Sequence, residues 1–75
     1  FNPATTISCD LPSKSNVRLT VYNVLGQEVI TLIDREMDAD QHSVSWDASK
    51  QASGVYFYRL EAGSFTETRK MLLLK

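Results

Sequence analysis

Apolar and polar side chains alternate along most of this chain, and that alternation is the feature that most constrains its fold. A period of two places successive side chains on opposite faces of a β-strand, whereas a helix repeats its apolar residues every three or four positions. The alternation recurs in six segments, which are residues 6–11, 17–22, 28–33, 41–46, 55–60 and 65–74. Turn-forming residues separate these segments, and no stretch of any length has a helical period.

The connections between the segments indicate how the strands follow one another. Residues 23–27 form a short connection that includes Gly26, and glycine adopts positive φ without a steric cost. This spacing predicts a hairpin between the second and third segments. The longer polar stretches at residues 34–40 and 47–53 are expected to be loops. Short strands at such regular spacing predict an all-β fold, an antiparallel sandwich.

Composition and charge bound the size and the class of the protein. With 75 residues, 43% of them hydrophobic, the chain fits a single globular domain over residues 1–75 and is too apolar for a disordered tail. Its formal net charge of −1 lacks the basic surplus that nucleic-acid binding requires. Apolar runs such as Met71–Leu74 are far shorter than the roughly 20 residues that span a membrane. Because the chain begins at Phe1 and not at Met, we expect a fragment of a larger protein.

The residues that carry catalytic chemistry are sparse. His42 is the only histidine, so the sequence lacks a second histidine for a metal site or a proton relay. A Ser–His–Asp set is formally available from His42, Asp47 and several serines, but no nucleophile-elbow motif accompanies it. A sandwich this short also offers little volume for a substrate pocket. We therefore predict a protein without catalytic residues and without a cofactor, in which His42 is a half-buried structural residue.

An acidic run provides the one candidate for a metal site. Asp34, Glu36, Asp38 and Asp40 place carboxylates at alternate positions, and oxygen ligands in such an arrangement suit Ca²⁺. The run lacks the mid-loop glycine and the distant bidentate glutamate of an EF-hand, and Arg35 lies within it. A solvated acidic turn is the preferred interpretation, and no metal ligand is assigned.

The cysteine and the large aromatic residues fall on faces that also carry apolar residues. Cys9 alternates with aliphatic neighbours, so we expect it to pack in the core as a small hydrophobic residue. Trp46, Tyr56 and Tyr58 are likewise expected in the core, because one inward Trp is common in sandwiches. The alternative is a stacking platform for sugars built from exposed aromatic residues such as Tyr22 and Trp46.

Five segments, taken in order, are similar to the sequence motifs of one protein family. They are FNPATTISCDLP at residues 1–12, VRLTVYNVLGQEV at 17–29, HSVSWD at 42–47, ASGVYFYRL at 52–60 and RKMLLLK at 69–75. Through them the chain resembles the type IX secretion system C-terminal sorting domain, which is related to the immunoglobulin-like domain of flagellar hook-capping proteins. The matches span nearly the whole chain, although Cys9 replaces the usual Phe.

The resemblance implies an immunoglobulin-like antiparallel β-sandwich of six to seven strands. It also implies a non-catalytic address label that follows an upstream cargo domain in an exported bacterial protein. In such proteins the domain crosses to the periplasm, an outer-membrane translocon recognises it, and a sortase-like protease often removes it. The cargo then reaches the cell surface or the medium. By position, the residues that match the motifs linked to recognition are Gly54, Val55, Tyr56, Gly63, Lys70 and Lys75.

Several of these features also have interpretations that involve no recognition. Lys70 and Lys75 belong to a final strand that a partner can read by strand addition, but edge lysines also protect a sheet from aggregation. Gly54 can serve simply as a strand-entry residue with positive φ. For the whole domain, the alternatives are an accessory immunoglobulin-like spacer or carbohydrate-binding module of an extracellular enzyme, and a structural domain of the hook-capping type.

Overall fold

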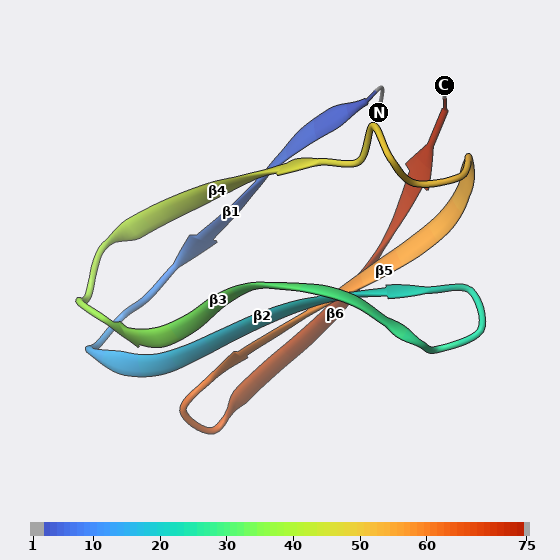
Figure 1. Ribbon diagram of the computed structural model, residues 1–75. Helices are drawn as coiled ribbons and strands as arrows, with labels where there is room; N and C mark the ends of the chain where they lie inside the picture. Colours follow the sequence, from blue (N-terminus) through green and yellow to red (C-terminus); the bar gives the residue numbers. More distant parts are fainter. Residues whose placement is uncertain (1–2, 75) are drawn as a thin grey trace.

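The computed structural model describes residues 3–74, and within them the chain forms six β-strands and no helix (Figure 1). The strands are β1 (Ala4–Asp10), β2 (Ser15–Asn23), β3 (Glu28–Met37), β4 (Gln41–Asp47), β5 (Gly54–Ala62) and β6 (Phe65–Leu73). They make two antiparallel sheets, one with the order β1-β4 and one with the order β3-β2-β5-β6. The predicted all-β, immunoglobulin-like sandwich is therefore confirmed.

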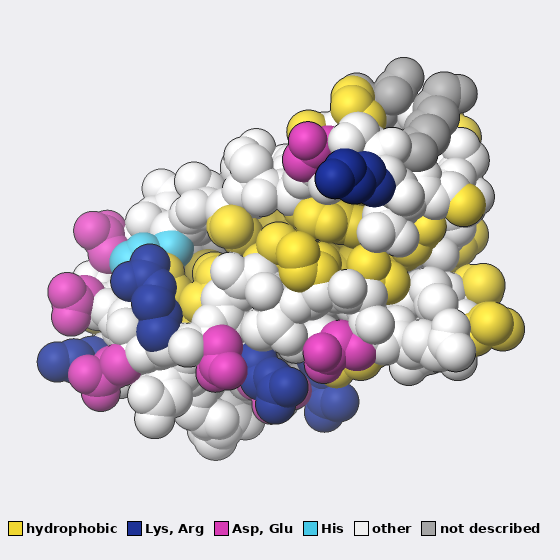
Figure 2. All heavy atoms as spheres, viewed as in Figure 1, with side chains coloured by type: hydrophobic (Ala, Val, Ile, Leu, Met, Phe, Trp, Pro, Cys, Tyr) yellow, Lys and Arg dark blue, Asp and Glu magenta, His cyan; other side chains and the backbone are white. Residues whose placement is uncertain are grey.

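The two layers of the sandwich are unequal, because a two-stranded sheet faces a four-stranded one. In Figure 1 the β1–β4 pair spans the upper layer and the larger sheet the lower layer. Hydrophobic side chains remain visible between the two layers along the face shown in Figure 2. The smaller sheet thus leaves part of the interior open at the side of the molecule.

The hydrophobic core consists of two clusters that lie between the sheets. One cluster gathers Ile7, Leu11, Val17, Leu19, Ile33, Met37, Leu60 and Ala62. The other gathers Val21, Trp46, Ala48, Tyr56 and Leu73. Both clusters contact the half-buried side chains of Leu32, Tyr58 and Met71, which therefore join them into a single interior.

The central strand β2 shows how the alternation of residue types produces this core. Val17, Leu19 and Val21 point inward and are almost completely buried, as the period of two predicts. Thr20 lies on the opposite face but is only 1% exposed, because β2 lies between β3 and β5, where Thr31 and Arg59 are its cross-strand partners. The alternation assigns Thr20 to the outer face but does not indicate this burial, because it depends on the neighbouring strands.

The predicted loop at residues 34–40 is wrong for its first four residues. β3 continues to Met37, which pairs with Ser15 at the start of β2 and is buried against the core. Asp34 and Glu36 are exposed along this extension, so their charges made the segment resemble a loop. Pairing with β2 satisfies those backbone groups of residues 34–37 that face it, and the burial of Met37 anchors the end of the strand.

The β2–β3 turn confirms the predicted hairpin and shows what holds it. Gly26 has a φ of 81°, in the left-handed region where glycine is favoured. The side-chain oxygen of Asn23 accepts hydrogen bonds from the backbone amides of Leu25 (2.9 Å) and Gln27 (3.0 Å). Val24 and Leu25 protrude from this turn with 68% and 78% of their surface exposed.

Candidate functional site

Four of the predicted recognition residues lie together at one end of the β5–β6 hairpin. Gly54, Val55 and Tyr56 begin β5, and the antiparallel register places them opposite Leu73, Leu72 and Met71. Lys70 follows on β6, opposite Phe57. The clustering was not evident from the sequence alone, because it depends on the strand register.

The other two predicted residues do not join this cluster. Gly63 occupies the turn at the opposite end of the same hairpin, between Ala62 and Phe65. Its φ is 61°, and its amide donates a 3.2 Å hydrogen bond to the carbonyl oxygen of Asn16. Gly63 is therefore placed to shape the turn. Lys75 lies outside the described residues.

Tyr56 belongs to the core and not to the exposed part of the cluster. It is 6% exposed, and its hydroxyl donates a 2.7 Å hydrogen bond to the carbonyl oxygen of Ala52. Its ring meets that of Trp46 edge-on, with 5.5 Å between the centroids. Gly54, directly before Val55, has a φ of 149°, which L side chains rarely adopt. These two residues fix the start of β5 and so position Val55.

The exposed part of the cluster is an apolar surface with one cation. Val55 and Leu72 are cross-strand partners on the outer face of the sheet. Phe57 and Lys70, two residues further along each strand, are partners on the same face. Leu72 is 51% exposed, Lys70 is exposed, and Val55 and Phe57 are half-buried. We call these four residues the hairpin-end patch. Its leucine was not among the predicted site residues, although its outward direction follows from the alternation in β6.

The candidate metal and catalytic groups are dispersed. Asp34 and Glu36 lie along β3, and within residues 3–74 no three side chains of His, Cys, Asp or Glu gather as a metal site. His42 is half-buried, as predicted, and its Nε2 donates a 2.8 Å hydrogen bond to the carbonyl oxygen of Asp38. The described residues also include no helix long and apolar enough to cross a membrane.

The structure also settles the positions of the cysteine and the tryptophan. Cys9 is half-buried and packs against the core, as predicted, and its burial together with the nearby charge of Asp10 raises the pKa of its thiol. Trp46 is 3% exposed, so its ring is not accessible to a sugar, and the expectation of a core tryptophan is confirmed. The exposed apolar residues Val24 and Leu25 went unnoticed, although two aliphatic residues in a turn are a visible signal.

The fold and the surface together define a small β-sandwich module. The family described as the secretion system C-terminal sorting domain matches residues 2–74, so the chain belongs to that family. Membership makes it a sorting signal of type IX secretion and implies export to the cell surface or the extracellular space. No curated protein and no solved structure matches the chain.

Proposed function

We propose that this domain is a non-catalytic sorting module whose hairpin-end patch contacts the outer-membrane translocon of type IX secretion. The observation that carries the proposal is the match of the sorting-domain family to residues 2–74. The domain follows its cargo across the periplasm in folded form and is recognised at the outer membrane. A sortase-like protease then separates it from the cargo, which stays at the cell surface or enters the medium.

The composition of the patch supports its role as a contact surface. A leucine with 51% of its surface exposed gains free energy when a partner covers it, and full burial of such a side chain is worth about 1.5–3 kcal/mol. Lys70 lies on the same outer face of β6 and adds a charge that can select an acidic partner surface. Within the described residues, β6 is also the last strand of the larger sheet, so the patch lies at an edge of that sheet.

A secretion assay tests the proposal. Residues 1–75 are fused behind a periplasm-directed fluorescent reporter in a bacterium that has the type IX apparatus. We expect the intact fusion to reach the surface or the medium, and we expect Lys70→Ala combined with Leu72→Ala to reduce export about tenfold or more, from the lost apolar contact. Both side chains point out of the core, so the variant should remain folded.

The matched control is Thr66→Ala combined with Thr68→Ala, on the same face of the same strand. It should be exported like the intact fusion. If the intact fusion stays in the periplasm although it is folded, the sorting proposal fails. If the patch variant is exported normally, the translocon contacts another surface. If Lys70 only protects an edge, the patch variant will aggregate, which size-exclusion chromatography of the purified domains detects.

A further inference from the structure

The outer edge of β1 carries a row of backbone groups that face away from β4. Leu11 donates its amide hydrogen to the carbonyl oxygen of Asp40, and Ala48 donates to that of Pro3, so odd-numbered residues of β1 are the ones bonded to β4. The amide and carbonyl groups of Ala4, Thr6, Ser8 and Asp10 therefore point outward. Within residues 3–74, no strand pairs with this edge.

Apart from Asp10 at its end, the sequence of β1 contains no residue that blocks pairing at this edge. Natural edge strands usually carry a lysine, a proline or a bulge that prevents another strand from adding to them. β1 contains no lysine, arginine or proline between Ala4 and Asp10, and its register with β4 is unbroken over all seven residues. By contrast, β3 has register shifts in its pairing with β2, and β6 carries Arg69 and Lys70.

Beneath the free edge of β1, the first half of β6 lacks cover. Phe65, Glu67 and Arg69 pair with core-facing residues of β5 and so point toward the smaller sheet, as Met71 and Leu73 do. Leu73 is fully buried, whereas Phe65 is 53% exposed at the other end of the strand. The inward face of β6 is thus buried at Leu73 and exposed to solvent at Phe65.

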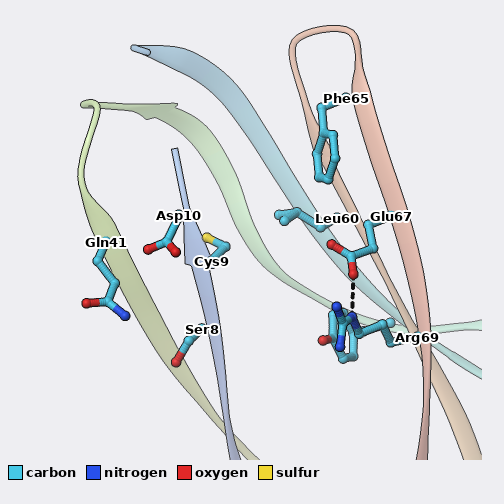
Figure 3. A pocket seen from close by; sticks show the side chains of 9 residues that line it. Ser8, Cys9, Asp10, Gln41, Leu60, Phe65, Glu67 and Arg69 are labelled. Carbon is cyan, nitrogen blue, oxygen red and sulfur yellow. Dashed lines mark hydrogen bonds and ion pairs between the residues drawn. The ribbon is translucent and has the colours of Figure 1, made fainter. Parts of the chain in front are cut away.

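The space over this open face is a groove between β1 and the β5–β6 hairpin (Figure 3). Two adjoining cavities of about 350 and 460 Å³ form it. Both are lined by Asp10, Leu60 and Phe65, and the first also by Cys9, Glu67 and Arg69. Glu67 and Arg69 form an ion pair with each other on its floor. We call this space the β1–β6 groove.

We propose that the β1–β6 groove accepts an extended segment of another polypeptide, which adds to the small sheet as a strand beside β1. The free row of amides and carbonyls selects an extended backbone, because these groups repeat every second residue. An inward side chain of the incoming strand that covers the exposed ring of Phe65 is expected to be apolar, whereas its neighbours would lie over the Glu67–Arg69 ion pair. This inference concerns a different surface from the hairpin-end patch and does not depend on it.

The negative charge of Asp10 indicates which residue type the incoming strand should carry on its solvent-facing side. Asp10 lies on the exposed face of β1 and forms no ion pair among the described residues. A lysine or arginine placed opposite it on the added strand would form a cross-strand pair. A second copy of β1 cannot supply this cation, because residues 4–10 contain no basic side chain. The occupant is therefore a partner segment that alternates inward apolar with outward polar residues, including a base.

Peptide selection followed by NMR tests the proposal. Random dodecapeptides displayed on phage are selected on the immobilised domain, and the enriched peptides are synthesised and titrated into ¹⁵N-labelled protein. We expect alternating sequences with a lysine or arginine. On binding, the amides of Thr6 and Ser8 should gain hydrogen-exchange protection, while those of Thr5 and Ile7, already bonded to β4, should change little.

Two matched proline variants test whether the peptide binds at the free edge of β1. Ser8→Pro removes an outward amide of β1, whereas Ser43→Pro removes the corresponding outward amide on the far edge of the same sheet, since Ser8 and Ser43 are cross-strand partners. Once both variants are shown to keep the buried environment of Trp46 by fluorescence, Ser8→Pro should weaken peptide binding at least about tenfold. Ser43→Pro should leave it unchanged.

Three results would overturn the proposal. Enriched peptides that bind Ser8→Pro as well as the natural sequence would show that the β1 edge is not the contact. If selection on the natural domain enriches no peptide beyond those recovered from the immobilised Ser8→Pro variant, the β1 edge is not a peptide-binding site. Protection of Thr6 and Ser8 that depends on protein concentration, without peptide, would assign the edge to a second copy of the chain.

Discussion

At the scale of single residues, chemical reactivity depends on how far each side chain lies within the sandwich. Cys9 shares the inward face of β1 with Ile7, but the open β1–β6 groove leaves it only half-buried. Its placement in the core was predictable from the alternation of β1, because a period of two assigns a face to every residue. Its partial exposure was not predictable, since it depends on the missing cover over β6.

The thiol of Cys9 should react more slowly than that of an unfolded chain at mildly alkaline pH. Burial and the charge of Asp10 raise its pKa above the ordinary value, which lowers the fraction of reactive thiolate. The alkylation rate with iodoacetamide should therefore have its inflection at higher pH in the folded domain than in urea. By linkage, stability from the neutral thiol is present below the unfolded pKa and is lost as the pH rises through the folded pKa. Equal inflections in both states would contradict this.

At the scale of elements, the turns were easier to predict than the strand ends. The hairpin between β2 and β3 followed from Gly26 within the short connection expected at residues 23–27, because few residues adopt positive φ. The extension of β3 through Asp34 and Glu36 was missed, since its stability comes from pairing with β2 and from Met37, neither of which a local charge pattern indicates. Four predicted recognition residues likewise came together only through the register of β5 with β6.

Gly26→Ala should destabilise the domain through the turn alone. Open space surrounds the position that a Cβ would occupy, so the penalty comes from the φ of 81°, and a left-handed conformation costs an L residue about 1–2 kcal/mol. Urea denaturation followed by Trp46 fluorescence measures the free energy of unfolding. Val24→Ala, in the same turn but 68% exposed, is the control and should change it by no more than about 0.5 kcal/mol. Equal effects of the two substitutions would refute the argument from φ.

At the scale of the whole molecule, the domain has a thin margin of stability. Six strands confirm the predicted sandwich, and unequal layers leave part of its interior open. A chain of 75 residues is stable by roughly 4–11 kcal/mol at ~0.05–0.15 kcal/mol per residue. The described residues include a single cysteine, so packing has to supply the stability that disulfides provide in many exported domains.

Leu19→Ala should bring the domain close to unfolding. Leu19 is 1% exposed at the centre of β2, and truncating such a leucine costs about 2–5 kcal/mol. The midpoint of urea denaturation should fall sharply, whereas Leu25→Ala, at a position 78% exposed, should leave it nearly unchanged. A small effect of Leu19→Ala would mean that the core repacks around the cavity.

The strand pairing also sets the order in which parts of the domain can fold. β1 is the first strand of the domain to be synthesised, yet its partner is β4, with Ile7 opposite Val44. β2 likewise needs β5 as well as its neighbour β3. Contacts between strands so far apart in sequence form slowly, because a long loop must close first. The small sheet therefore cannot form before β4 is available, so β1 remains without its partner while the β2–β3 hairpin can already pair.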